Sequence, residues 1–141
     1  VPSYDVHNAD LSSPYTGISY LLEDLQAKGI LIAVASNKYQ EATVKLVKQY
    51  FPNIDFVEIL GQREGINVKP DPSIVSDILT KANVSPEETL YVGDSGVDMQ
   101  TAINAGVDAV GVTWGFRPRA ELEGFCPKGL IDKAEELLRF V

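Results

Sequence analysis

A continuous apolar run at residues 30–35, Ile-Leu-Ile-Ala-Val-Ala, constrains the fold more than any other part of the sequence. The run has the length and β-branched content of a strand, and its unbroken apolar character is typical of a strand buried on both faces. Before it, apolar residues repeat at helical spacing over residues 16–28, and Gly29 stands where a C-terminal helix cap belongs. A helix followed by a doubly buried strand predicts a parallel sheet covered by helices.

Helix and strand signals alternate along the rest of the chain. We expect helices near residues 40–50, 73–81, 97–105 and 132–140, and strands near residues 56–60, 89–93, 108–112 and 130–131. Ser85, Pro86 and Glu88 combine an N-cap, a proline at the first helical position and a capping-box glutamate, so a further turn begins there. This order predicts an α/β fold, a doubly wound, Rossmann-like parallel sheet built from right-handed βαβ units.

Composition limits the partners of the chain. Its net charge is −8, from 20 acidic and 12 basic residues, which repels nucleic acid at long range. Cys126 is the only cysteine, so an intrachain disulfide and a cysteine-based zinc site are excluded. No apolar stretch approaches membrane-spanning length. We expect a cytoplasmic protein with no membrane or nucleic-acid partner, for which a small phosphorylated metabolite remains a possible ligand through local charges.

Polar residues follow the expected strands where ligands bind in open α/β sheets, beyond the carboxyl ends of the strands. Ser36 and Asn37 follow the first strand and could bind phosphoryl oxygens together with backbone amides. The alternative is that one of them caps the next helix. Lys69, held extended by Pro70 and Pro72, could present a cation to a phosphate or a carboxylate, or could be a solvated surface residue.

Asp94 and Asp98 form the strongest candidate pair. Gly93 permits a tight exit from the strand, Asp94 follows it, and Asp98 lies about one helical turn further on. Magnesium prefers oxygen ligands and usually takes one or two protein carboxylates. The alternative makes Asp94 a turn residue and Asp98 a first-turn carboxylate favoured by the helix dipole. His7, Trp114 and Cys126 belong to no such constellation and receive no role.

Taken in order, Ser36-Asn37-Lys38, Lys69-Pro70-Asp71-Pro72, Gly93-Asp94-Ser95-Gly96-Val97-Asp98 and Gly111-Val112-Thr113-Trp114-Gly115 resemble motifs of the haloacid dehalogenase superfamily, in its phosphoglycolate phosphatase-like branch. The resemblance implies a Mg²⁺-dependent phosphatase that hydrolyses a small phosphate monoester through an aspartyl-phosphate. It assigns catalysis to Ser36 and Lys69, phosphate binding to Ser36, Asn37 and Lys69, and the metal to Asp94 and Asp98, with Ser95 beside them.

One part of the family pattern has no counterpart here. The family begins with an Asp-x-Asp-Gly-Thr type motif at the end of its central strand, which supplies the nucleophile and the general acid and base, and no such run occurs in this sequence. We therefore expect residues 1–13 to be the tail of a helical cap domain and residues 14–141 to be a catalytic core that lacks its first strand. The chain would then be part of a longer enzyme and inactive alone.

Several other functions stay open. Within the superfamily, the alternatives are a sugar phosphomutase, a pyrophosphatase and a haloacid dehalogenase, of which the last needs no magnesium and gives no reason for the pair of Asp94 and Asp98. From a different class comes a non-catalytic module that binds phosphate or metal or acts through protein contacts. The missing first motif favours that module, whereas the three retained motifs favour an enzyme.

Overall fold

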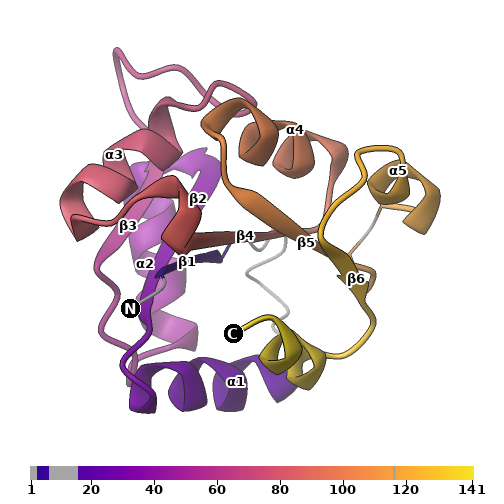
Figure 1. Cartoon of the computed structure of the whole chain (residues 1–141). Helices are drawn as coiled ribbons and strands as arrows, with labels where there is room; N and C mark the ends of the chain where they lie inside the picture. The colour runs from indigo at the N-terminus through magenta and orange to yellow at the C-terminus, as the bar shows by residue number, and fades with distance from the viewer. Residues whose placement is uncertain (1–2, 7–15, 116) are drawn as a thin grey trace.

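The computed structural model of the chain describes residues 3–6, 16–115 and 117–141. Its strands are β1 (Ser3–Val6), β2 (Leu31–Tyr39), β3 (Glu58–Gln62), β4 (Thr89–Gly93), β5 (Asp108–Val112) and β6 (Gly129–Ile131). Its helices are α1 (Thr16–Ala27), α2 (Gln40–Tyr50), α3 (Ser73–Ala82), α4 (Gly96–Ala105) and α5 (Arg119–Glu123), with 3-10 helices η1 (Pro86–Glu88) and η2 (Ala134–Phe140). These strands form one parallel sheet in the order β3-β2-β1-β4-β5-β6, which confirms the predicted doubly wound α/β fold (Figure 1).

Helices cover both faces of the sheet, with α3 and α4 on one side and α1 on the other (Figure 1). Alternate residues of strands β2 to β6 contribute to two separate cores. Ile32 and Val34 pack with α1, α2 and η2, whereas Ala33 and Ala35 pack with α3, α4 and α5. Burying one large aliphatic side chain contributes about 1.5–3 kcal/mol, so the two cores hold the helical layers against the sheet. None of the helices in the described part of the chain is long and apolar enough to cross a bilayer.

Strand β2 leaves the regular ladder just where the polar residues begin. Its register with β3 shifts between Ala35 and Tyr39. The side chain of Gln40 takes over the pairing there, because its amide donates to Ile59 O at 2.8 Å and accepts from Gly61 N at 2.6 Å. A Cβ on Gly61 would lie 2.4 Å from the carbonyl oxygen of Lys38, so glycine is required for this close approach. The edge ladder stays satisfied while Ser36 and Asn37 leave the sheet.

The centre of the sheet differs from the sequence-based expectation. The core was expected to lack its first strand, but Ser3–Val6 form β1 between β2 and β4, with Tyr4 paired to both Ile32 and Leu90. The physical reason is that β2 and β4 would otherwise expose unpaired backbone groups on both sides of a gap. Most of residues 1–13, predicted to be the tail of a cap, lie outside the described residues, and so does His7.

Candidate active site

Segments far apart in the sequence meet at the carboxyl end of the sheet. Ser36 and Asn37 follow Ala35 in β2, Lys69 precedes α3, and Asp94 lies between β4 and α4, which carries Asp98. Hydrogen bonds link all three segments, since Lys69 contacts both Asn37 and Asp98. The structure therefore brings together the residues that the sequence analysis grouped from their motifs.

Lys69 is a buried cation with a fixed partner. Its Nζ donates to Asp98 Oδ1 at 2.8 Å and to Ala35 O at 3.4 Å. The side chains of Lys69 and Asp98 are only 1% and 0% exposed. Charged groups are almost never buried to this extent unless they are paired. The alternative of a solvated surface lysine is therefore wrong.

The backbone of Lys69 is held as firmly as its side chain. Lys69 N donates to Asn37 Oδ1 at 3.0 Å, and Asn37 Nδ2 donates back to Lys69 O at 3.4 Å. Two residues later, Asp71 Oδ1 accepts from Ser73 N at 2.8 Å and starts α3, and the hydrogen bonds from Ser73 lower the pKa of Asp71. The amide of Asn37 thus positions Lys69, while its predicted contact with phosphate stays a prediction.

Ser36 is buried at the point where β2 leaves the sheet, with 2% of its surface exposed. Its Oγ accepts from Lys38 N at 3.1 Å and closes a local turn. The N-cap of α2 is Tyr39, which makes no side-chain cap bond. The helix-capping alternative is therefore wrong for Ser36, and its predicted contact with phosphate stays a prediction.

Asp98 is the centre of the hydrogen-bond network. Its Oδ1 accepts from Lys69 Nζ and, at 3.1 Å, from the hydroxyl of Tyr91, while its Oδ2 accepts from Asp94 N at 3.0 Å. Asp98 N donates to Ser95 Oγ at 3.2 Å, so Ser95 is the N-cap of α4. Both oxygens of Asp98 accept from protein donors, so Asp98 positions Lys69 and Asp94, while its predicted role as a metal ligand stays a prediction.

Asp94 is the open carboxylate of the site. It is 5% exposed, and within residues 3–6, 16–115 and 117–141 its Oδ1 is buried without a hydrogen-bond partner. Burial, followed by the nearby charge of Asp98, raises the pKa of Asp94 to about 6, although the charge of Lys69 opposes this. Buried polar atoms nearly always have partners, so an orphaned carboxylate oxygen fits the direct ligand of a cation.

The carboxylate oxygens of this site are of the kind that a hard divalent cation prefers. No cluster of three or more His, Cys, Asp or Glu side chains that could hold a metal occurs in the described part of the chain. Magnesium commonly takes only one or two protein carboxylates and fills its other positions with water and phosphate. Asp94 therefore fits a magnesium ligand, and Asp98 supports it through the backbone of Asp94.

The loop after β5 closes against Asp94. A Cβ on Gly115 would lie 2.5 Å from Asp94 Oδ2, so the loop backbone touches the carboxylate. Trp114 is partly buried against the core on the α1 face, as ordinary packing predicts. In α5, Glu121 Oε2 accepts from Gly96 N at 2.6 Å at the start of α4. Sequence reasoning missed both Glu121 and Tyr91, because neither belongs to a recognisable motif.

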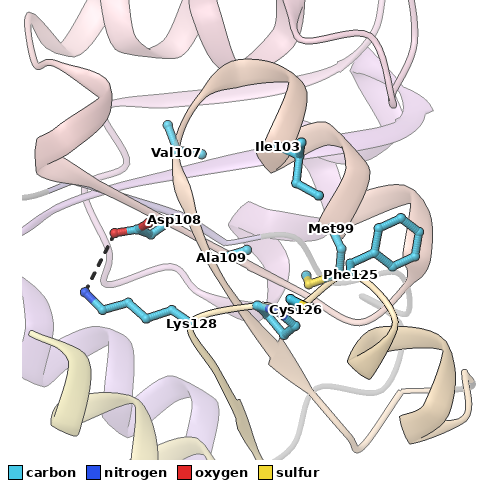
Figure 2. A pocket seen from close by; sticks show the side chains of 9 residues that line it. Met99, Ile103, Val107, Asp108, Ala109, Phe125, Cys126 and Lys128 are labelled. Atoms are coloured by element: carbon cyan, nitrogen blue, oxygen red, sulfur yellow. Dashed lines mark ion pairs between the residues drawn. The ribbon is translucent and has the colours of Figure 1, made fainter.

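A cavity lies away from this site, beside the amino ends of β5 and β6. The cavity, of about 360 Å³, is lined by Met99, Phe125 and Cys126 among others (Figure 2). Lys128 and Asp108 form an ion pair at its edge, with Nζ and Oδ2 3.8 Å apart. Asp98 and Met99 are neighbours in α4, but the side chain of Asp98 lies in the candidate site and that of Met99 lines this cavity.

Comparisons with known proteins agree with the motifs. A family model described as haloacid dehalogenase-like hydrolase matches residues 2–112. The phosphoglycolate phosphatase of Pseudomonas putida is 32% identical over 129 residues, which cover 92% of this chain and 47% of that protein. Pyrophosphatase PpaX of Bacillus mycoides is 32% identical over 137 residues, covering 94% and 61%.

Solved structures give the same result. The crystal structure of a proposed phosphoglycolate phosphatase from Lactobacillus delbrueckii subsp. bulgaricus is 38% identical and superposes with a TM-score of 0.83, covering 89% of this chain and 52% of that one. The chain spans about half of the length of several proteins that it matches.

Proposed function

The chain belongs to the haloacid dehalogenase-like hydrolase family, and on that premise we propose that it forms the phosphoryl-binding core of a magnesium-dependent phosphatase for a small phosphate monoester. One observation carries the proposal. A fixed, buried cation, Lys69, shares Asp98 with the backbone of Asp94, whose own carboxylate keeps an oxygen without a partner in the described residues. A site with one cation and one open carboxylate suits a phosphate dianion that arrives with a divalent metal.

The residues of this chain would act mainly by positioning and by neutralising charge. In phosphoryl transfer, charge spreads over the equatorial oxygens of the transferring group, and fixed cations stabilise that charge. Lys69 is suited to this role because Asn37 fixes its backbone and Asp98 fixes its ammonium. Ser36, buried at the end of the regular part of β2, would orient a phosphoryl oxygen through its hydroxyl.

Asp94 would hold the magnesium ion. When bound, the ion supplies a Lewis acid that offsets negative charge on the phosphoryl oxygens. The family resemblance implies that an aspartate attacks phosphorus, that the phosphorus–oxygen bond to the alcohol breaks, and that water then hydrolyses the aspartyl-phosphate to inorganic phosphate. That aspartate is not assigned to any described residue. The described residues prepare the phosphoryl group for such an attack.

Phosphate release by the intact protein tests the proposal. We expect release from phosphoglycolate or another monoester with Mg²⁺ and none after chelation with EDTA. Asp94→Asn should remove the Mg²⁺-dependent rate, because an amide is a poor magnesium ligand. Undiminished, metal-independent turnover by Asp94→Asn would overturn the assignment.

Pyrophosphate hydrolysis is a second candidate, favoured by the likeness to Pyrophosphatase PpaX over 94% of this chain. The same site would hold either substrate, since both present a terminal phosphoryl group. Rates with pyrophosphate, phosphoglycolate and a hexose phosphate under one set of conditions separate the candidates. Isomerisation of the hexose phosphate without phosphate release would instead indicate a phosphomutase.

A further inference from the structure

Tyr91 places a phenol hydroxyl inside the catalytic network. The side chain lies in the middle of β4, is 0% exposed, and belongs to the core on the α3 and α4 face. Its hydroxyl donates to Asp98 Oδ1 at 3.1 Å, the same oxygen that accepts from Lys69 Nζ at 2.8 Å. Buried tyrosine hydroxyls usually find a partner, but here the partner is one half of a buried ion pair.

The contacts of Asp98 come from three directions. Tyr91 on β4 and Lys69 before α3 approach Oδ1, and the backbone of Asp94 approaches Oδ2. Lys69 and the Asp94 amide each restrain one oxygen of Asp98, and the Tyr91 hydroxyl, on a ring fixed by core packing, adds a rigid restraint on Oδ1 that does not depend on the flexible lysine chain. The orientation of Asp98 then decides where the ammonium of Lys69 points.

We propose that Tyr91 is a positioning residue of this site: its hydroxyl fixes Asp98, and through Asp98 it aligns the ammonium of Lys69 and the backbone of Asp94. The catalytic consequence rests on the proposed phosphatase function, but the structural consequence does not. In this role Tyr91 acts on the site through its hydrogen bond to Asp98.

Amide hydrogen exchange tests the structural part without any substrate. In Tyr91→Phe the ring stays and only the hydroxyl is lost. The amide of Asp94, which donates to Asp98, should exchange about tenfold faster. Exchange at Val110, buried in β5, should stay unchanged. Tyr20→Phe, the same change at a 68% exposed position on α1, is the matched control and should alter neither amide.

The outcomes separate a positioning role from a general loss of stability. Faster exchange at both Asp94 and Val110, or at neither, would overturn the inference. If Tyr91→Phe does not fold, the unmodified protein still decides, because a hydrogen-bonded, buried Tyr91 hydroxyl proton should be resolved by NMR as a slowly exchanging signal. A rapidly exchanging hydroxyl would contradict the geometry.

Kinetics of the intact protein test the catalytic part. Tyr91→Phe should lower kcat about tenfold and leave KM within about twofold, because alignment of Lys69 matters most for charge that develops in the transition state. In an Asp98→Asn background the same change should have little further effect, since the carboxylate through which Tyr91 acts is already absent. Losses that multiply in the double variant would contradict action through Asp98. An inactive unmodified protein would refute the phosphatase function while leaving the exchange result to judge Tyr91.

Discussion

Two lysine–aspartate ion pairs in the described part of the chain lie at opposite ends of one sheet, and they differ in distance and in exposure to solvent. Lys69 and Asp98 lie 2.8 Å apart with side chains 1% and 0% exposed. Lys128 and Asp108, drawn in Figure 2, lie 3.8 Å apart with side chains 50% and 67% exposed. Water solvates the exposed pair, whereas the buried pair depends on Tyr91 and on the backbone of Asp94. An ion pair constrains chemistry only where protein donors replace the solvent.

The largest expected effect comes from removing the buried cation. Lys69→Met should lower the free energy of unfolding by about 3–5 kcal/mol, because it leaves Asp98 charged and buried without its partner. The rate of the proposed phosphatase reaction should fall about 10²–10³-fold, as for other lost charge-stabilising groups. Urea denaturation and steady-state kinetics measure the two effects. A loss below about 1 kcal/mol would place this pair in the same class as the exposed one.

A smaller effect is expected from crowding Asp94. Gly115→Ala should lower kcat by about 10–100-fold, because the new Cβ would lie 2.5 Å from Asp94 Oδ2 and must displace the carboxylate. Half-maximal activation should need more Mg²⁺. Gly124→Ala is the matched control, since the nearest atom to its Cβ lies at 3.7 Å, and its kinetics should match those of the unmodified protein. Equal rates for both variants would show that Asp94 tolerates displacement.

Asp94 should also make stability depend on pH in the metal-free protein. Because its folded-state pKa is raised from 3.8 to about 6, the folded protein binds the proton more tightly than the unfolded chain, so stability falls as the pH rises from about 4 to 6. Asp94→Asn should lack this fall and be more stable at pH 7 by about 1–2 kcal/mol, because it has no charge to bury.

Thermal denaturation between pH 4 and pH 7 in EDTA measures this difference. Added Mg²⁺ should then stabilise the unmodified protein but not Asp94→Asn. Parallel pH profiles for the two proteins would mean that Asp94 is not held in a charge-disfavouring environment.

The smallest effect is expected at the exposed pair. Lys128→Met, the same substitution as at Lys69, should change the free energy of unfolding by less than about 0.5 kcal/mol, because the side chains of both Lys128 and Asp108 are exposed to solvent. Activity should be unchanged, since the pair lies at the far end of the sheet. Denaturation in urea at low and high salt measures it. A loss of stability as large as that of Lys69→Met would show that burial does not distinguish the two ion pairs.

Local sequence signals predicted most of the fold. The strands Thr89–Gly93 and Asp108–Val112 were expected at the residues where they occur, because they are short apolar runs bounded by turn residues. The capping box at Ser85 and Glu88 is present, with Ser85 N 3.0 Å from Glu88 Oε1. The last helix forms as 3-10 turns in η2. The central place of β1 was not foreseen, because pairing with β2 and β4 is decided by distant strands and not by the segment itself.

The sequence motifs predicted which residues belong to the candidate site. They did not predict the contacts between segments that are distant in the sequence. Lys69 and Asp94 belong to short motifs in which neighbouring proline and glycine residues mark a turn. Tyr91 looks like an ordinary core aromatic in a strand, and its bond to Asp98 depends on how β4 turns into α4. The hydrogen bond between the side chain of Asn37 and the backbone of Lys69, 32 residues away, was not foreseen either, and the predicted phosphate contact of Asn37 stays a prediction. Such roles require knowledge of which segments meet.

On the proposed function, the same meeting of segments would link the cellular lifetime of the protein to its ligands. Because the site draws on β2, on the segment before α3 and on α4, it exists only when the whole sheet is assembled. A ligand bound there at a hundred times its Kd would add about 2.7 kcal/mol to the stability of the fold. Proteases act mainly on opened chains, so changes of this size alter abundance several-fold. The supply of metal and phosphorylated substrate would then set the amount of protein that survives as well as its rate of turnover.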